Sequence, residues 1–332
     1  MLNPDVPALV LAPMEGITDA PMRALQGTTG AFTYAVSEFL RVSGDALPRK
    51  VFHRDIPELL NGGFTPTGLP VQVQLLGGDP GRMAVSAFVA VQAGARAVDI
   101  NFGCPAPTVN RHDGGASLLK HPERICEIVA AVRHAVPPEV PVSAKLRLGW
   151  DSIDPIMENA EMATKGGASW ITIHARTRLQ GYLPPVHWKS IGQVREALGI
   201  PVVANGDIWT LDDFRRCQEE TGCRHFMLGR GALADPTLPV QIAHALGLGG
   251  ATSDTAWLPL LRRLVTFTEQ GSGQPSTYTV MKLKQWLKIA HLRGSFAYFH
   301  DIKQARTLDE FFDCLKEAMD RPPVTTSDGG NQ

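Results

Sequence analysis

The sequence predicts an α/β fold, a closed (β/α)8 TIM barrel followed by a small C-terminal all-helical domain. Eight short apolar runs recur between residues 8 and 231, and segments with apolar residues at helical spacing separate them. Strand–helix units repeated at intervals of about 25–45 residues are typical of a parallel sheet with crossover helices, and eight of them fit a closed barrel. A doubly wound open sheet is the alternative. The regular eight units, and the lack of a Gly-rich turn after the first strand, count against it.

The eight predicted strands are short and strongly apolar, as strands buried on both faces of a parallel sheet usually are. In chain order they are ALVLAPM (8–14), TYAVSEFL (33–40), VQVQLLG (71–77), AVDINFG (97–103), VSAKLRLG (142–149), WITIHAR (170–176), PVVANGD (201–207) and HFMLGRG (225–231). Between them, segments such as 122–136 and 154–167 have apolar residues at helical spacing. Asp151, Ser152 and Asp154 offer caps for the start of the second of these helices.

The chain changes character after Gly247. The stretch LGLGGATSD (246–254) reads as a linker, and from Thr255 onward the pattern is helical with no strand signal. We therefore predict a barrel over 1–247, a helical domain over 255–320 and a flexible tail over 321–332. The helical domain carries a basic run around Trp286, made of Lys282, Lys284, Lys288, His291 and Arg293.

Composition excludes several classes of protein. The formal net charge is −1 over 332 residues, so no overall basic field indicates nucleic acid, although a local basic patch can still bind it. The five cysteines form no CxxC pair and lack zinc spacing, so we expect reduced thiols, no metal and a cytoplasmic protein. No apolar stretch approaches the ~18 residues of a membrane span, and no signal peptide is expected. A monomer is the default expectation.

One thiol stands out in DINFGCPAPTVN (99–110), because Cys104 follows directly on a predicted strand, in a turn bounded by Gly103 and Pro105. Cys104 could be a nucleophile, a metal ligand, an inert thiol or a proton donor. No Cys/His/Asn arrangement or zinc spacing supports the first two roles. A thiol with a pKa near ~8.5 is protonated at neutral pH and can still give up its proton. Its place on the rim, where barrels carry their function, argues against an inert thiol.

Other polar residues end the predicted strands on the same rim. Lys145 and Arg147 are two residues apart, so both side chains share one face and are expected to point into the barrel mouth. There they could stabilise an anionic ring or leaving group, or else reach out from the rim to solvent. His174 could clamp a phosphate, act as an acid or base, or be structural.

Gly-containing turns end the last two predicted strands, where barrels frequently bind phosphate on backbone N–H groups. Ordinary turn chemistry is the alternative for any single glycine. The residues that fit a phosphate site are Asn205, Gly206, Gly229 and Arg230.

Seven stretches, in order over residues 8–233, together resemble the tRNA-dihydrouridine synthases. They are APMEGITD (12–19), VQLLG (73–77), NFGCPAPTVNRHDGGASLL (101–119), KLRLGWD (145–151), HARTRLQGY (174–182), ANGDI (204–208) and GRGAL (229–233). Three further stretches resemble the bacterial C branch, which acts on uridine 16 of the tRNA D-loop. They are VFHRDIPEL (51–59), RLGWDS (147–152) and KLKQWL (282–287).

The resemblance implies an oxidoreductase that reduces a tRNA uridine, at position 16, to 5,6-dihydrouridine. It implies FMN as the cofactor, NADPH as the electron donor, hydride transfer from reduced FMN to C6 and a proton from Cys104 to C5. It further implies FMN contacts from Pro13, Met14, Glu15, Gln74, Lys145, His174, Asn205, Gly206, Asp207, Gly229 and Arg230. Asn101 is expected to hold the base, and further substrate or tRNA contacts are expected from Arg41, Arg147, Arg176, Lys282, Lys284, Lys288 and Arg293.

The match has departures, and other functions compete with it. Pro107 stands where many relatives have a lysine, and Arg111 or His112 is the candidate substitute. For the basic run, a solvated helix face is the alternative to tRNA binding. The competing functions are an FMN-dependent TIM-barrel oxidoreductase that acts on a small molecule, and a tRNA-binding module without catalysis, against which the intact Cys104 argues.

Overall fold

Eight parallel strands close into a barrel in a computed structural model that describes residues 1–110, 114–249, 256–272 and 276–321. The ring closes because β1 pairs with β9 and β2 pairs with β4, which confirms the predicted fold class. The strands of the ring are β1 (Ala8–Leu11), β2 (Tyr34–Val36), β4 (Val71–Leu76), β5 (Val98–Asn101), β6 (Val142–Arg147), β7 (Trp170–His174), β8 (Val202–Asn205) and β9 (His225–Leu228). A short β3 (Leu40–Arg41) pairs with β4 alone.

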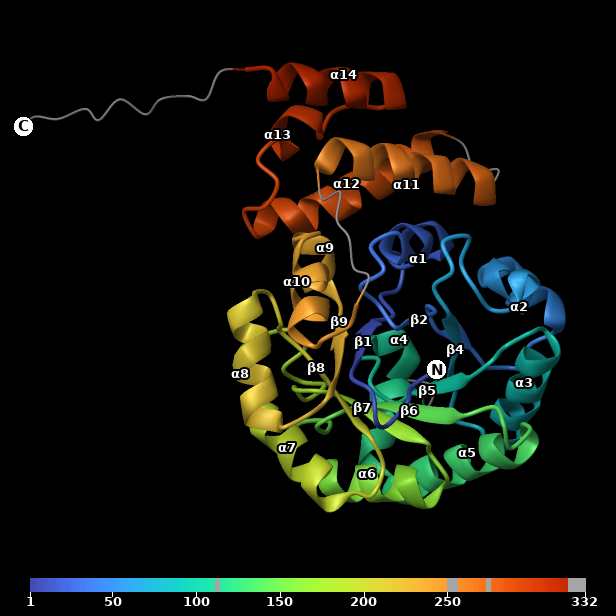
Figure 1. Cartoon of the computed structure of the whole chain (residues 1–332). Coiled ribbons are helices and arrows are strands. Elements are labelled where there is room, and N and C mark those ends of the chain that lie inside the picture. The colour runs from blue at the N-terminus through green and yellow to red at the C-terminus, as the bar shows by residue number, and fades with distance from the viewer. Residues whose placement is uncertain (111–113, 250–255, 273–275, 322–332) are drawn as a thin grey trace, which may run out of the picture.

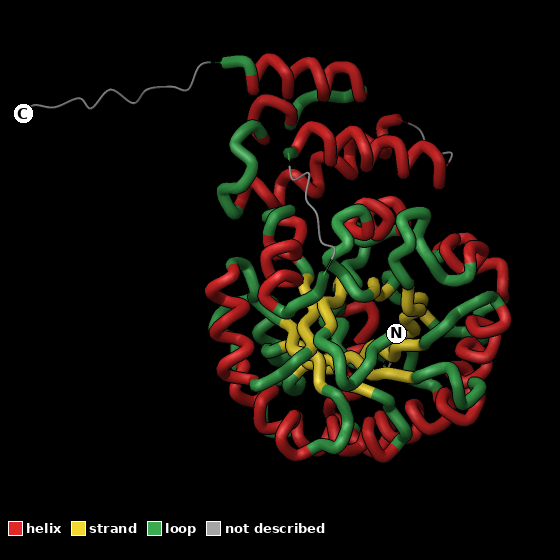
Figure 2. The backbone as a smooth tube through the Cα atoms, viewed as in Figure 1, coloured by secondary structure: helices red, strands yellow, loops and turns green. Residues whose placement is uncertain are grey.

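Helices surround the ring, as Figures 1 and 2 show. They are α1 (Ala20–Gly27), α2 (Arg49–Asp55), α3 (Pro80–Gln92), α5 (Pro122–Ala135), α6 (Ile156–Lys165), α7 (Trp188–Ala197), α8 (Leu211–Thr221), α9 (Arg230–Ala234) and α10 (Leu238–Ala245), with 3-10 turns η1 (Pro57–Asn61) and η2 (Gly115–Lys120). The short α4 (Pro107–Asn110), which follows β5, is drawn inside the ring in this view. Local chemistry sets several helix starts. Asp19 and Asp79 accept backbone N–H groups as N-caps of α1 and α3, and Thr210 forms a capping box with Asp213 at α8.

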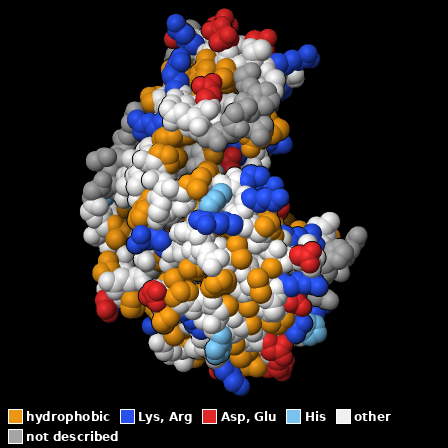
Figure 3. Space-filling view, turned by 90° about the vertical axis from the view of Figure 1, so that its right-hand side faces the viewer, with side chains coloured by type: hydrophobic (Ala, Val, Ile, Leu, Met, Phe, Trp, Pro, Cys, Tyr) orange, Lys and Arg blue, Asp and Glu red, His pale blue; other side chains and the backbone are white. Residues whose placement is uncertain are grey.

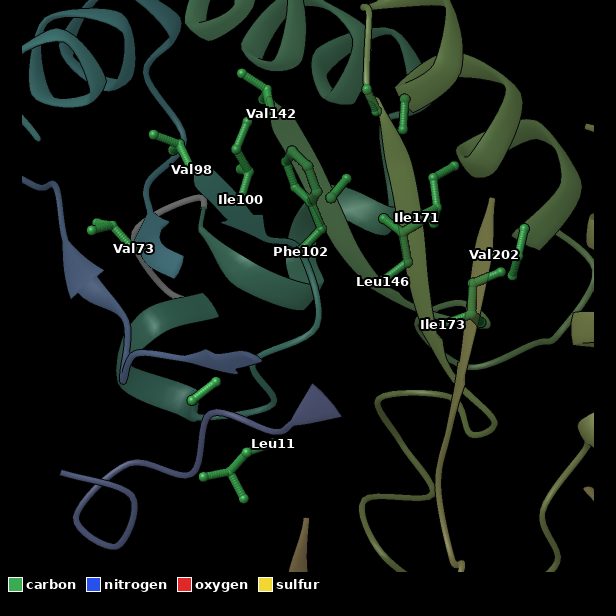
Figure 4. Packing of buried hydrophobic residues seen from close by; sticks show 14 of the residues in the cluster. Leu11, Val73, Val98, Ile100, Phe102, Val142, Leu146, Ile171, Ile173 and Val202 are labelled. Atoms are coloured by element: carbon green, nitrogen blue, oxygen red, sulfur yellow. The ribbon is translucent and has the colours of Figure 1, made fainter. Parts of the chain in front are cut away.

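The main apolar core lies between the strands and the surrounding helices. Figure 4 shows side chains of β5, β6 and β7, among them Ile100, Leu146 and Ile171, gathered in this cluster. The alternate positions of the same strands point the other way, into the barrel. Those inward positions are polar on β4, β5 and β6, where the hydrogen-bonded side chains are Gln72, Gln74, Asp99, Asn101 and Ser143.

Four helices follow the barrel and lie beside its α1 and α9 (Figure 1): α11 (Trp257–Ser272), α12 (Ser276–Leu292), α13 (Phe299–Ile302) and α14 (Leu308–Met319). We call them the helical module. Its core is shared with the barrel, because Met22 and Leu25 of α1 and Leu233 of α9 belong to the same buried cluster as Leu261 and Trp286. The module is therefore packed on the barrel through apolar contacts.

Candidate active site

A cavity of about 590 Å³ opens at the carboxyl ends of the barrel strands, where the sequence predicted a site. Its walls come from segments that follow β1, β5, β7, β8 and β9. The predicted residues that line it are Pro13, Met14, Glu15, Asn101, Cys104, Lys145, Arg147, His174, Asn205, Gly206, Asp207, Gly229 and Arg230. The fold thus brings together residues that are up to 217 positions apart in the chain, from Pro13 to Arg230.

Cys104 is held on the cavity wall by the amide of Asn101. The backbone N–H groups of Gly103 and Cys104 both donate to Asn101 Oδ1, each at 2.9 Å. The thiol is 9% exposed, and burial is the largest cause that raises the pKa of Cys104 above its ordinary value. The sulfur therefore carries its proton at neutral pH, in a fixed position facing the cavity.

Behind Asn101 lies a chain of buried hydrogen bonds. Asn101 Nδ2 donates to Gln74 Oε1 at 2.9 Å, and Gln74 Nε2 donates to Asp99 Oδ2 at 2.7 Å. Gln74 is fully buried and absent from the cavity wall. In this structure the Gln74 side chain orients Asn101, and its contact with a cofactor stays a prediction.

Lys145 and Arg147 both face the cavity, as their spacing predicted. Lys145 Nζ lies 3.4 Å from Asn205 Oδ1, and burial, followed by the charge of Arg147, lowers the pKa of Lys145 to about 8. Arg147 donates to the carbonyl oxygens of Gly103, Thr177 and Gly181. It therefore supports the loops that follow β5 and β7 while its guanidinium lines the cavity.

His174 is neutral and has an open ring nitrogen. Burial, and then the charges of Arg147 and Lys145, lower the pKa of His174 well below its ordinary value. Its Nδ1 is buried and has no hydrogen-bond partner among the described residues. A buried ring nitrogen of this kind is costly unless something binds it, so we expect a ligand polar atom nearby.

The turns after β8 and β9 form a cradle with little room for side chains. Gly206 has a φ of +120°, and a Cβ there would lie 3.3 Å from the backbone nitrogen of Ala175. Gly229 precedes Arg230, the first residue of α9. Asp207 pairs with the guanidinium groups of Arg176 and Arg230. Burial opposes the charge on Asp207, but the two arginines hold its pKa below the ordinary value.

Arg176 was expected to contact the substrate, and in this structure it lies outside the cavity lining. Its side chain is fully buried, binds both oxygens of Asp207 and donates to the Leu183 carbonyl. Arg176 therefore positions Asp207, which in turn orients Arg230. Arg230 keeps its place on the cavity wall.

Two aromatic residues that the sequence reasoning missed complete the rim. Tyr182 and Trp209 line the cavity, and Arg230 lies over both rings, at 4.3 Å and 4.9 Å from their centroids. Arg147 also faces the Tyr182 ring. The available signal was position: Tyr182 lies in the long loop after β7, and Trp209 in the turn after β8.

The basic residues of the helical module fall into three groups. Lys282, which was predicted to contact tRNA phosphates, is 3% exposed and pairs with Asp19 at 2.6 Å. Lys284 is half-buried and donates to the Ala305 carbonyl. Lys288 and Arg293 are exposed, and Arg293 lies 3.5 Å from the centroid of the Trp209 ring at the cavity rim.

The remaining predicted residues are Arg41, which lies near the cavity, and Arg111 and His112. Arg41 lies at the end of β3, two residues after Phe39 of the cavity lining, and donates to the Thr108 carbonyl at 2.9 Å. Arg111 and His112 lie outside the described residues. Within the part of the chain that the structure describes, no group of three metal-ligating side chains occurs. No described helix combines the length and apolar character that a bilayer crossing requires.

Comparisons with known proteins agree with this geometry. Residues 10–321 match the sequence model of the family described as "Dihydrouridine synthase (Dus)". The chain is 44% identical over 314 residues to the tRNA-dihydrouridine(16) synthase of Shewanella oneidensis, covering 94% of this chain and 98% of that protein. It is 44% identical over 318 residues to the protein of that name from Ralstonia nicotianae, covering 94% and 96%.

Solved structures show a similar fold at low sequence identity. Histamine dehydrogenase from Rhizobium sp. 4-9 matches with a TM-score of 0.55 and 14% identity, over 78% of this chain and 49% of that one. A 2-naphthoyl-CoA reductase complex matches with a TM-score of 0.54 and 12% identity, over 72% and 50%. Both support the barrel fold alone. The match to the family over residues 10–321, together with relatives that are 44% identical along nearly their whole length, identifies this chain as a member of the dihydrouridine synthase family, an oxidoreductase.

Proposed function

We propose that this protein reduces a uridine of tRNA to 5,6-dihydrouridine, with FMN as its cofactor and NADPH as the electron donor. One observation carries the proposal: the protonated thiol of Cys104 faces the same cavity as Lys145 and a glycine-lined cradle. The two relatives described above, which align over 94% of this chain, are both named tRNA-dihydrouridine(16) synthase. We therefore propose uridine 16 of the D-loop as the target.

The cavity residues fit FMN. The ribityl phosphate needs a close-approach backbone and a cation, which Gly206, Gly229 and Arg230 provide. The orphaned Nδ1 of His174 lies in the same wall and needs a polar partner. Pro13 and Met14 supply an apolar surface for a ring system, and Lys145 supplies a positive charge beside it.

FMN, when bound, supplies the hydride that reduces C6 of the uracil ring. A base inside folded RNA cannot reach this cavity, so the nucleotide is extruded and read within it. Cys104 holds a proton on Sγ and transfers it to C5, which completes saturation of the C5=C6 bond. Asn101 keeps the thiol in place through two backbone N–H groups, and Lys145 stabilises negative charge that develops on the ring nearby.

We further propose that the exposed cations of the helical module, Lys288 and Arg293, hold tRNA phosphates while the barrel performs the chemistry. The proposed division is a catalytic domain over 1–247, a tRNA-binding domain over 255–320 and a tail over 321–332. A cytoplasmic monomer is the proposed state.

Replacing Cys104 by alanine tests the proposal. We expect the variant to keep its flavin spectrum and its reduction by NADPH, while dihydrouridine formation in tRNA falls at least ~100-fold, because the proton donor is lost. The half-buried Cys126 on α5 is the matched control, and its alanine variant should keep full activity. Nucleoside mass spectrometry after single turnover is the measurement.

Two outcomes would contradict the proposal. Loss of flavin from the Cys104→Ala variant would mean that this residue binds the cofactor. Wild-type protein that oxidises NADPH with a small unsaturated substrate, but leaves tRNA unchanged, would instead favour a small-molecule oxidoreductase. Mapping the modified position in tRNA then tests uridine 16 separately.

A further inference from the structure

An open groove of about 770 Å³ lies beside the catalytic cavity, at the carboxyl ends of β3 and β4 and the start of α3. Three arginines from three different segments line it: Arg41, Arg82 and Arg124. Lys and Arg side chains are visible over several parts of the face that Figure 3 shows. This groove differs from scattered surface charge because its three guanidinium groups share one concave surface.

The groove lies directly behind the Cys104 loop. Leu76 and Val109 line it, and the same two side chains pack with Cys104 in one small buried cluster. One layer of side chains therefore separates the groove from the catalytic thiol. A group bound in the groove would therefore lie close to Cys104.

Backbone carbonyls hold each guanidinium in place. Arg41 donates to Thr108 O at 2.9 Å and Arg82 to Ser43 O at 2.7 Å. Arg124 donates to Gly78 O at 3.1 Å. Since a guanidinium has five N–H donors, every arginine keeps several free after this anchoring. Such fixed forks match the oxygens of a phosphate.

The charges in the groove are only partly neutralised by carboxylates. Among the described residues, no Asp or Glu pairs with Arg41 or Arg82, while Arg124 forms an exposed pair with Glu127 at 2.8 Å. Asp79 is the acid on the groove wall, and its Oδ1 already accepts the Arg82 backbone N–H at 2.8 Å. Gathering like charges in a shared hollow is unfavourable unless an anion binds there.

We propose that this groove binds a phosphate group carried by one of the two substrates of the proposed reaction. This inference rests on the function proposed above. Position favours a backbone phosphate of tRNA, because the nucleotide that reaches Cys104 has a phosphate on either side. The 2′-phosphate of NADPH has the same chemistry and is the other source. Recognition uses Arg82 and Arg124 as fixed donors, with Arg41 on the adjoining wall.

The test removes two charges from the groove of the full-length protein. For the double variant Arg82→Ala/Arg124→Ala we expect the equilibrium Kd for tRNA to rise about tenfold, and the slope of log Kd against log salt to fall by about 2. The matched control, Arg215→Ala/Arg216→Ala, removes two exposed charges from α8 and should change neither quantity. The variant Arg82→Lys/Arg124→Lys keeps the charge and should recover the salt slope.

Kinetics identify which substrate carries the phosphate. An unchanged tRNA Kd with a raised KM for NADPH, and an unchanged KM for NADH, supports the groove and assigns it to the nucleotide. If groove and control variants match in tRNA Kd and in both KM values, the groove proposal is overturned. Because the Kd is measured without turnover, tight binding with no dihydrouridine formed would instead overturn the proposed function alone.

Discussion

At the residue scale, Asp99 is a buried acid below the floor of the cavity. Its carboxylate accepts hydrogen bonds from Ser143 and Gln74, yet burial raises the pKa of Asp99 to about 6. When the pKa of a carboxyl group is raised in the folded state, the free energy of unfolding of the protein falls as the pH rises from the unfolded-state pKa to the folded-state pKa. The charged form therefore costs about 3 kcal/mol of folding free energy at neutral pH. The network that orients Asn101 is kept at the expense of stability.

Asp99→Asn should stabilise the protein more at pH 8 than at pH 5, by about 1–2 kcal/mol in the free energy of unfolding. The reason is that wild-type Asp99 is mostly protonated at pH 5 and buried as an anion at pH 8. Urea denaturation at both pH values measures the difference, with exposed Asp151→Asn as the control. An equal effect at the two pH values would show that the buried charge is unimportant.

Residue identity predicted which side chains point into the barrel, but not what each one touches. The two-residue spacing of Lys145 and Arg147 predicted that both face the barrel mouth, and they do. It did not show that Gln74 and Asn101 are hydrogen-bonded to each other. An amide can bind a ligand or a neighbouring side chain, and the pattern looks the same in both cases. For Arg176 likewise, nothing in the sequence indicated its carboxylate partner Asp207, which lies 31 residues away in the chain.

At the scale of elements, α12 reaches from the helical module to the loop between β1 and α1. Lys282 pairs with Asp19 at 2.6 Å and approaches the Ile17 carbonyl at 3.4 Å. On the other side, Glu38 accepts the Ile17 N–H at 3.0 Å. Ile17 and Met14 of this loop line the catalytic cavity. One helix of the module thus helps to fix a wall of the active site.

Lys282→Met should lower the free energy of unfolding by about 3 kcal/mol, because it leaves Asp19 without its cation in a largely buried place. The double variant Lys282→Met/Asp19→Asn should recover much of this loss, since asparagine still caps α1. Thermal denaturation is the measurement, and exposed Lys288→Met on the same helix is the control. A double variant no more stable than the single one would contradict this charge pairing.

The sequence predicted all eight barrel strands, and it erred where a strand is interrupted. The expected strand over 33–40 is divided into β2 and β3, with the break at residues 37–39. Glu38 lies in the break and turns to the Ile17 N–H. Alternation within a short run cannot show such a break, because the partner loop is distant in sequence. For the same reason, the sequence did not show which face of α12 is buried.

At the scale of the whole molecule, barrel and helical module share a buried cluster. Trp286 of α12 is 1% exposed, contacts Trp257 with the two rings tilted by 57°, and donates to the Leu233 carbonyl of α9 at 2.9 Å. Because α1, α9, α11 and α12 all contribute to this cluster, neither part buries its apolar surface without the other. The sequence pattern distinguishes an α/β part from a helical part, but it gave no sign of this common core.

We expect the barrel and module to unfold together in one transition, and Trp286→Ala to lower the free energy of unfolding by about 3–5 kcal/mol through the cavity it leaves. Denaturant unfolding followed by circular dichroism and by tryptophan fluorescence tests both points. Leu292→Ala, at a site that is 72% exposed, is the control. A biphasic curve with the module melting first would argue for two independent cores.

The pairing that closes the ring has a consequence for how the chain is made. β1 pairs with β2 early, but its second partner, β9, exists only once residues 225–228 have been made. At about 5–20 residues per second, the ribosome needs about 10–45 s to supply them. During that interval one edge of β1 is unpaired. The apolar face of α1 stays uncovered for longer, until α11 and α12 have been synthesised. Nascent chains of this protein therefore expose unpaired strand edges and apolar surface during much of their synthesis. Chaperones that bind nascent chains cover surfaces of this kind.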